Sequence, residues 1–434
     1  MQGCKGARDG REDGDDGEKR RLRFGAMRLI ILFGIISLLG DIIYEGARSV
    51  NGPYLDLLGV NAATVGLVAG AGELLGYGLR LATGYLSDRT RAYWAFTILG
   101  YGMLLTVPML ALAGIWQLVA FLIIMERVGK AIRNPAKDTI LSQSAKQVGT
   151  GWGFAMVEVL DQIGAVGGPL IFTAVFLLLG AGAGSVSGYQ KGYLALAAPF
   201  AILMLVVIYA YLTIRDPSRF EAAIARQPQE DRLSKTFWLY SVFTFLAAFG
   251  LVSFVLIGYH LKARALAPDA WIPLFYAAAM LIDAGMAVVV GKLYDRQKTI
   301  RQSESGGLYL LIVIPLLTVP IPLLAFSTSL PLILVAVVLF GAVMGAHETI
   351  MKAAIADITS LKKRGTSYGI FNTSYGLALF FGTSLAGLLY DLSLPLLIAV
   401  VAVAEVLALL VFFLMVRGIA SAPPAVSRTS PPAS

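Results

Sequence analysis

The sequence predicts an all-α membrane protein in which twelve transmembrane helices form two pseudo-symmetric bundles of six. Three observations lead to this fold class. The 434 residues are 57% hydrophobic and only 14% charged, with a mean hydropathy of +0.74. About a quarter of the residues in a typical water-soluble protein are charged, so this chain must use lipid as its main solvent. Long apolar stretches recur along the chain, and a short loop sequence appears twice, about half a chain apart.

The apolar stretches of the chain are long enough to cross a membrane. A helix needs about 20 mainly apolar residues to cross the hydrocarbon core of a bilayer. By this measure the expected spans lie near residues 27–48, 62–86, 93–113, 115–134, 151–179, 192–214, 236–259, 271–293, 307–326, 331–351, 366–389 and 394–417.

The distribution of basic residues predicts how these spans are oriented. Most Lys and Arg residues between the spans fall in alternate loops, whereas the remaining loops hold only Lys191, Lys262 and Arg264. This positive-inside asymmetry predicts that both termini are cytoplasmic. The formal net charge of +8 is therefore a topology signal, and we expect no nucleic-acid partner.

Composition divides the chain into five segments. Residues 1–26 form a polar leader that we expect to be disordered, because so little of it is apolar. The first six-helix bundle covers 27–214, a cytoplasmic linker covers 215–235, and the second bundle covers 236–417. The tail, 418–434, is rich in Ala, Pro and Ser, and we expect it to be disordered. The sequence leaves open whether Met1 or Met27 is the first residue.

Internal repeats indicate that the two bundles arose by duplication. The loop Gly84-Tyr85-Leu86-Ser87-Asp88-Arg89 recurs as Gly291-Lys292-Leu293-Tyr294-Asp295-Arg296. A Glu and a Lys four residues apart close the fourth and tenth spans, at Glu126 with Lys130 and Glu348 with Lys352. A glycine-rich segment opens the fifth and eleventh spans, at 149–153 and 365–369.

These residues resemble the major facilitator superfamily. Its signature loop between the second and third helices reads roughly G-x-L-a-D-r-x-G-r, and a weaker copy follows the eighth helix. The matching positions here are Gly84, Leu86, Asp88 and Arg89, then Gly291, Leu293, Asp295 and Arg296. The second glycine of the motif is replaced by Arg91, which is a departure.

Two further segments resemble bacterial efflux-type, drug/proton antiporter-like members of the superfamily. Residues 126–138 look like the pattern of the fourth helix and the loop after it. Residues 164–169 match the first part of the fifth-helix antiporter motif, G-x-x-x-G-P. The glycine pair expected after it is absent, since Phe172 and Thr173 stand there.

The loop motif has a physical interpretation as a gate. A helix N-terminus presents free N–H groups and partial positive charge, which stabilise a nearby carboxylate. The resemblance implies that Asp88 meets the start of helix eleven near 365–368, and that Asp295 makes the mirror contact near 149–152. We expect these contacts to latch the cytoplasmic side when it is closed. The alternative is that Arg89 and Arg296 only anchor the loop ends to lipid headgroups.

Ionisable side chains at bilayer depth cost several kcal/mol unless they are paired or hydrated, so each one is a functional candidate. The resemblance implies that helices one, four, seven and ten line a central cavity. The charged candidates for the solute and proton pathway are then Asp41, Glu45, Arg48, Glu126, Arg127 and Lys130. Structural ion pairs, such as Glu73 with Arg80 or Glu126 with Lys130, are an equal alternative. Glu405 stands alone on helix twelve, and we expect it to lie in a helix-packing position or at a lipid edge.

The fifth span carries two acids three residues apart, Glu158 and Asp161. Two such carboxylates repel each other unless one holds a proton or a cation lies nearby. We therefore expect Asp41, Glu45, Glu158 or Asp161 to carry a coupling proton. Arg48, Arg127 or Lys130 would compete with that proton or bind an anionic group.

The second bundle offers mainly aromatic and amide groups to the cavity, among them Tyr259, Asn372 and Tyr375. A charged bundle that faces a less polar one suits an amphipathic solute or one of modest charge.

Other function classes lack their motifs. No nucleotide-binding loop surrounds Lys130, because Ile124 and Ala131 stand where such a loop needs Gly and Ser or Thr. His347 and Glu348 lack the second histidine of a metalloprotease. One cysteine, Cys4, and two histidines are too few for a thiolate or His-rich metal site. We expect no enzyme activity, no metal and no cofactor.

The sequence thus predicts a multi-pass, monomeric secondary transporter of a bacterial cytoplasmic membrane. It would move a small molecule by alternating access, with protons as the coupling ion and the lipid bilayer as its other partner. Export by antiport is favoured over uptake by symport. A transport-incompetent receptor on the same fold stays open, and the sequence does not identify the solute.

Overall fold

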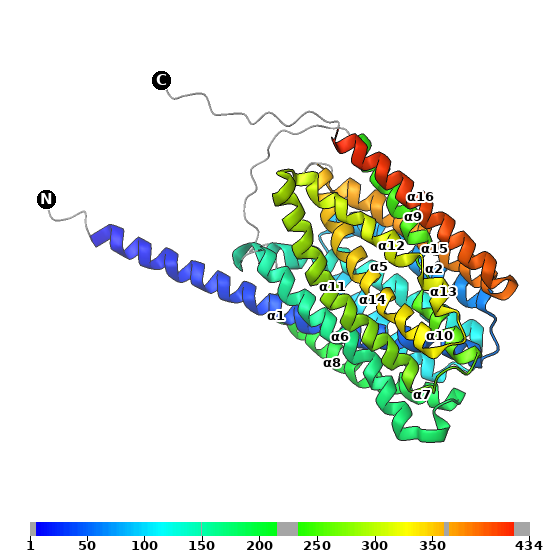
Figure 1. The fold of residues 1–434 in the computed structure, drawn as a ribbon. Coiled ribbons are helices and arrows are strands. Elements are labelled where there is room, and N and C mark those ends of the chain that lie inside the picture. Colours follow the sequence, from blue (N-terminus) through cyan, green and yellow to red (C-terminus); the bar gives the residue numbers. More distant parts are fainter. Residues whose placement is uncertain (1–5, 149, 215–232, 360–363, 421–434) are drawn as a thin grey trace.

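The computed structural model describes residues 6–148, 150–214, 233–359 and 364–420, which are almost entirely helical (Figure 1). The α-helices are α1 (Gly6–Leu57), α2 (Ala62–Thr90), α3 (Tyr93–Gly102), α4 (Thr106–Met109), α5 (Trp116–Val148), α6 (Thr150–Leu179), α7 (Val186–Ala195), α8 (Ala197–Thr213), α9 (Lys235–Phe249), α10 (Phe254–Ala263), α11 (Trp271–Arg301), α12 (Val313–Thr318), α13 (Ile321–Ala325), α14 (Leu330–Ile358), α15 (Arg364–Leu392) and α16 (Leu394–Ala420). Short 3-10 helices are η1 (Met103–Leu105), η2 (Leu110–Leu112), η3 (Gly180–Gly182) and η5 (Glu304–Ile312).

Eleven helical stretches of the described residues are long and apolar enough to cross a membrane. Several are composite, because α3 continues through η2, α7 through α8, and α9 through α10. The helix α5 is not among the eleven. Its first eighteen residues include four charges, at Glu126, Arg127, Lys130 and Arg133. The all-α membrane fold class is confirmed, whereas the number twelve and the cytoplasmic termini stay predictions.

The predicted leader differs from the structure, because α1 begins at Gly6 and residues 6–26 are helical. These residues continue the helix of the first span, and extending a formed helix is easier than nucleating a new one. The first turns of α1 project away from the bundle (Figure 1). Residues 215–232 of the predicted linker and 421–434 of the predicted tail lie outside the described residues, so the segment boundaries stay predictions.

Close helix packing around α1 depends on glycine at two contacts. A Cβ atom added to Gly168 of α6 would lie 2.2 Å from the carbonyl oxygen of Ile42 in α1. One added to Gly52 of α1 would lie 2.0 Å from the carbonyl oxygen of Val255 in α10. Only hydrogen fits in such gaps, so α1 touches the backbones of both neighbours.

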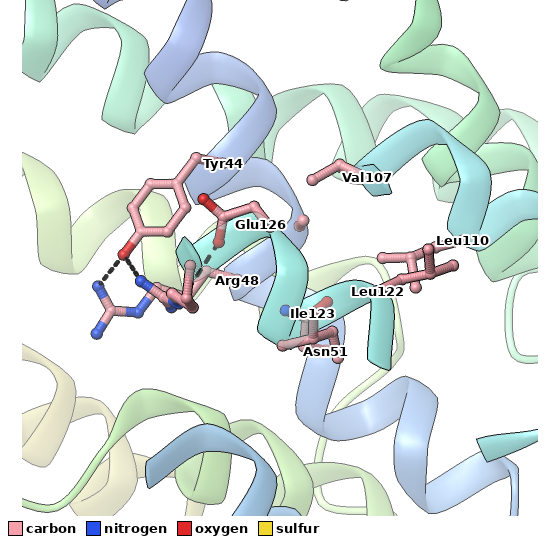
Figure 2. A pocket seen from close by; sticks show the side chains of 10 residues that line it. Tyr44, Arg48, Asn51, Val107, Leu110, Leu122, Ile123 and Glu126 are labelled. Carbon is pink, nitrogen blue, oxygen red and sulfur yellow. Dashed lines mark hydrogen bonds and ion pairs between the residues drawn. The ribbon is translucent and has the colours of Figure 1, made fainter. Parts of the chain in front are cut away.

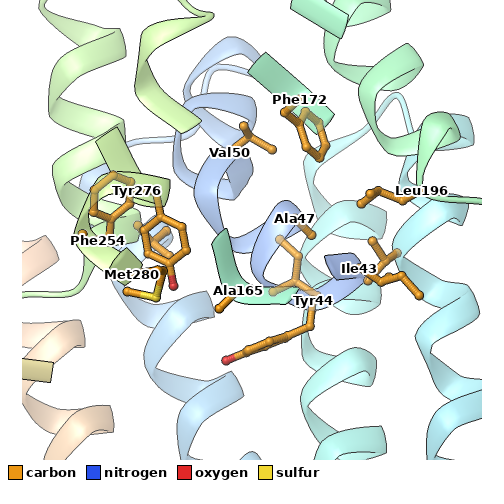
Figure 3. Close-up of a cluster of buried hydrophobic side chains, with 14 of the residues drawn as sticks. Ile43, Tyr44, Ala47, Val50, Ala165, Phe172, Leu196, Phe254, Tyr276 and Met280 are labelled. Atoms are coloured by element: carbon orange, nitrogen blue, oxygen red, sulfur yellow. The ribbon is translucent and has the colours of Figure 1, made fainter. Parts of the chain in front are cut away.

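The described helices pack around two separate apolar cores. We call the end of the molecule that holds Asp88 and Asp295 the motif end, and the end that holds Asn61 and Asp391 the Asn61 end. The first core runs through the helices of residues 26–214 and includes parts of 251–280, 321–343 and 386–401. Figure 3 shows the part of it around Tyr44, Ala47 and Tyr276. The second core is built from residues between 240 and 415 nearer the motif end. The two bundles therefore share one apolar core at the Asn61 end, while the second bundle keeps its own core at the motif end.

Polar contacts also join the two bundles at the Asn61 end. The hydroxyl of Tyr189 in α7 donates to Asp269 Oδ1, 2.5 Å away, before the start of α11. Lys262 Nζ lies 2.7 Å from the same oxygen. The backbone N–H of Ala63, in the first turn of α2, donates to Asp391 Oδ2 of α15 at 2.8 Å. Apolar and polar contacts together close this end of the molecule.

We predict that Tyr189→Phe opens the Asn61 end. A hydrogen bond to a charged group contributes about 1.5–3 kcal/mol, so its loss shifts the balance between closed and open conformations roughly tenfold or more. The measurement is the distance between spin labels at Leu112→Cys and Leu392→Cys, which are 81% and 69% exposed, in a Cys4→Ser background. The longer distance should gain population.

The matched control is Tyr240→Phe. Tyr240 is also fully buried, but its hydroxyl donates to the carbonyl of Met351 within the second bundle, at 2.7 Å. Its loss should leave the spin-label distance unchanged. Equal effects of the two variants would show that the Tyr189 contact is not a closure element.

Candidate functional site

A cluster of buried charges lies in the first bundle, where α1, α2 and α5 meet. Arg48 Nη2 and Arg127 Nη2 both contact Glu73 Oε1, at 3.3 and 3.4 Å. Arg127 also contacts Glu126 at 3.5 Å, and Arg48 contacts Glu45 at 3.8 Å. The spacing of Glu45 and Arg48, three residues apart, places both on one face of α1. Each arginine thus bridges two carboxylates.

Tyr44 stands at the centre of this cluster (Figure 2). Its hydroxyl accepts hydrogen bonds from Arg48, at 3.1 Å, and from Arg127. Lys130 Nζ lies 3.8 Å from the centre of the Tyr44 ring, a cation–π contact. One phenol therefore holds three cations from two helices within the same small volume.

One hydrogen bond links this cluster to the second bundle. The hydroxyl of Tyr276 in α11 donates to Glu45 Oε2 at 2.5 Å. Tyr276 is buried and packs on Phe254 of α10, with ring centres 4.6 Å apart (Figure 3). A change in the charge or contacts of Glu45 would therefore be felt directly by the helices of the second bundle.

A second group of charges lies one to two turns nearer the motif end, between α1, α5 and α6. Lys137 Nζ donates to Ser37 Oγ at 3.0 Å. Asp161 lies beside Ser37, and one of its carboxylate oxygens is buried without a hydrogen-bond partner among the described residues. Asp41 interacts electrostatically with Asp161, Lys130 and Lys137. Two acids and two lysines thus lie within electrostatic range of one another, beside the central cluster.

Helix packing brings these groups together. Gly164 and Gly168 of α6 lie against the α1 backbone, and a Cβ at Gly164 would lie 3.1 Å from the Cβ of Asp41. The small residues of the G-x-x-x-G-P segment therefore set the distance between the carboxylate of Asp41 and that of Asp161.

A small cavity adjoins the central cluster inside the first bundle (Figure 2). It is lined by Tyr44, Arg48, Asn51 and Glu126 together with apolar residues of α4, η2 and α5. Its volume of about 10 Å³ holds about one water molecule and is far below the roughly 300–1,000 Å³ of typical ligand pockets. We do not assign solute binding to this cavity.

The structure gathers some predicted residues and separates others. The six charged candidates Asp41, Glu45, Arg48, Glu126, Arg127 and Lys130 lie together, and Asp161 extends the group. Glu158 is exposed on α6. Glu73 pairs with Arg48 and Arg127, whereas Arg80 stacks on the ring of Tyr77 at 4.2 Å.

The predicted residues of the second bundle do not share one location. Tyr375 of α15 is buried, packs on Tyr77 across the bundles with ring centres 5.0 Å apart, and lies 3.4 Å from His347. Asn372 is half-buried one turn before it. Tyr259 contacts Tyr390 near the Asn61 end, away from the central cluster. Sequence reasoning missed the roles of Tyr44 and Tyr276, and only the position of Tyr44 next to Glu45 gave a signal.

The signature loops lie at the exposed motif end. Asp88 is exposed and accepts a hydrogen bond from Tyr93 of its own bundle at 3.2 Å, and Asp295 is exposed as well. The predicted partner segments are 149–152 and 365–368. The structure does not describe the side chains of 149–152 and 365–366. The latch stays a prediction for a conformation in which the motif end is closed. Arg91, where the motif has glycine, adopts the left-handed conformation with φ of 54°.

Comparison with known proteins adds to this geometry. The sequence profile of the Major Facilitator Superfamily matches residues 30–323 and 307–433. An uncharacterised protein of Mycobacterium tuberculosis is 36% identical over 399 residues, covering 91% of this chain and 94% of the relative. An uncharacterised MFS-type transporter of Methanocaldococcus jannaschii is 26% identical over 385 residues, covering 84% and 89%.

Solved structures share the fold at low sequence identity. A mutant of the nucleoside transporter NupG superposes with a TM-score of 0.67 at 14% identity, covering 89% of this chain and 99% of that one. An inward-facing, unoccupied bacterial homologue of the human lysosomal transporter Spinster gives 0.66 at 17% identity, covering 92% and 99%. The sequence profile, the relatives and the fold agree with the signature loops of the two bundles. The named relative and the solved structures that match are transporters and not enzymes. This chain belongs to the Major Facilitator Superfamily.

Proposed function

We propose that the protein is a secondary active transporter that exports a small molecule across a bacterial cytoplasmic membrane in exchange for protons. Transport by alternating access follows from the family. The observation that carries proton coupling is the path from Lys137 and Asp161 through Asp41 and Lys130 to the central cluster. Two acids that approach each other inside a membrane favour a state in which one of them is protonated.

The central cluster supplies the means by which a solute and a proton would compete. Arg48 and Arg127 share Glu73. A proton or a solute that takes this carboxylate therefore breaks one buried ion pair of each arginine and leaves them Glu45 and Glu126. Breaking a buried pair in this way costs about 3–5 kcal/mol. That energy can be recovered only by rearranging the helices, which is what a coupled transporter requires.

The hydrogen bond from Tyr276 to Glu45 is the proposed route by which this change reaches the second bundle. In the described conformation, buried apolar and polar contacts close the Asn61 end. A change at Glu45 or Arg48 would release Tyr276 and allow the opposite closure, with Asp88 and Asp295 as latches.

Uptake by symport is the second candidate, since the same proton path serves either direction. Export is favoured because residues 164–169 resemble the first part of the antiporter motif G-x-x-x-G-P and residues 126–138 resemble the fourth-helix pattern of efflux-type members. A receptor that does not transport is the third reading. A thermal-shift screen of metabolites and drugs should first identify a solute. If reconstituted vesicles never show gradient-dependent uptake or release of any solute, the receptor is favoured.

We predict that Asp161→Asn abolishes the proton-driven flux of the solute found in that screen. The amide keeps the shape of the side chain but cannot release a proton. Cells that overexpress this variant should also lose the tolerance to a toxic solute that the unchanged protein gives. The control is Glu158→Gln. Glu158 lies one turn away on the same helix but is exposed, so this variant should retain flux. Retained flux in Asp161→Asn would reject the coupling role of Asp161.

We also predict that Tyr276→Phe separates binding from transport. The Tyr276 hydroxyl donates to Glu45 but is not itself a member of an ion pair, so the variant keeps every ion pair of the central cluster. It should therefore bind solute with nearly unchanged affinity. Its maximal flux should fall about tenfold or more, since a hydrogen bond to a carboxylate contributes about 1.5–3 kcal/mol. Tyr240→Phe, which alters one bundle only, is the matched control. A change in affinity with unchanged maximal flux would contradict the proposed route.

A further inference from the structure

The span that runs from Lys235 to Ala263 is interrupted near its middle. The helix α9 ends at Phe249, and α10 begins at Phe254 with Ser253 as its cap, whose hydroxyl accepts from the N–H of Val255 at 3.3 Å. At 1.5 Å per residue the break lies about 22 Å from the start of α9. Irregular backbone at membrane depth is tolerated only where it is buried in protein or lines a water-filled cavity.

The side chain that covers this break is Glu405 of α16. A Cβ added to Gly250 would lie 2.2 Å from Glu405 Oε1, so the carboxyl group rests directly on the broken backbone. Glu405 is 0% exposed, which excludes the lipid edge. Neither carboxyl oxygen has a hydrogen-bond partner among the described residues.

No charged group of the described residues offsets Glu405. The helices packed on α16 are α9, α12, α13 and α15, with η5 beside them. The charged residues of those elements lie at helix ends, at Lys235, Glu304, Arg364 and Asp391. The basic residues within α10 are His260 and Lys262, in its last turn and far from the break. An ionised carboxylate in such surroundings costs several kcal/mol, whereas the neutral acid costs much less.

The position of Glu405 coincides with the boundary between the two apolar cores. On one side of the break, Tyr240, Phe243 and Ala248 of α9 belong to the second core. On the other side, Leu251 and the buried residues of α10 belong to the first core. The same change of core occurs on α16, between Val401 and Ala408. The unpartnered carboxyl therefore lies where the two parts of the second bundle join.

We propose that Glu405 is a proton-binding site that controls a hinge at residues 250–253. The proton is bound in the described conformation, in which α10 packs on α1 and the Asn61 end is closed. When α10 moves away from α1, the break opens and Glu405 gains water, so the proton can leave. Because the proton binds the closed conformation more tightly, acid favours closure of the Asn61 end and alkali favours its opening. This inference does not depend on the solute, on the direction of transport or on Asp161.

Infrared difference spectroscopy of the full chain in lipid vesicles tests proton binding directly. The spectrum of the unchanged protein minus that of Glu405→Gln should contain the carbonyl stretch of a protonated carboxylic acid at neutral pH. The control is Asp357→Asn, because Asp357 is paired with Lys298 at 3.0 Å, and its difference spectrum should contain an ionised carboxylate instead. A carboxylate signal for Glu405 would overturn the proposal. Should Glu405→Gln fail to fold, Glu405→Asp must shift the same acid band.

Spin-label distances between Leu112→Cys and Leu392→Cys test the hinge. In the unchanged protein, the longer distance should gain population as the pH rises. Glu405→Gln mimics the protonated side chain, so it should keep the closed distance at alkaline pH. If Glu405→Gln follows the same pH dependence as the unchanged protein, Glu405 does not control the hinge. Asp161→Asn, measured in parallel, separates a failure of this site from a failure of the proposed coupling site.

Discussion

The electrostatic cost of placing charge inside a membrane is the constraint on which this structure depends. Arg48, Arg127 and Glu73 satisfy one another in the first bundle, and Tyr44 accepts hydrogen bonds from both arginines. The second bundle meets the cluster with a neutral hydroxyl, that of Tyr276. The bundles thus have the same fold but different chemistry. This charge cluster belongs to the first bundle, and we propose that the second bundle responds to its rearrangement.

The second organising feature is the division of the apolar core. The two bundles share one apolar core at the Asn61 end, and a second core of the second bundle lies nearer the motif end. Interior packing is dense and does not deform continuously, so a change of conformation must exchange one set of contacts for another. Glu405 and the break beside Gly250 lie where that exchange has its pivot.

Sequence reasoning predicted the fold class and the family. It also predicted the grouping of Asp41, Glu45 and Arg48, because helical periodicity fixes which residues share a face. It did not predict contacts that depend on how helices from different parts of the chain meet. Glu73 was paired with Arg80 as one alternative, yet it binds Arg48 and Arg127. Tyr259 was placed with the cavity residues but lies beside Tyr390. Such partners depend on helix rotation and tilt, which one sequence does not encode locally.

The turn between α2 and α3 has a mechanical consequence. Only Arg91 and Ala92 separate the two helices, Arg91 is held in a left-handed conformation, and the Tyr93–Asp88 hydrogen bond spans the joint. So short and constrained a connection cannot act as a swivel. α2 and α3 should therefore move together, so a displacement of the signature carboxylate also moves the start of the third span.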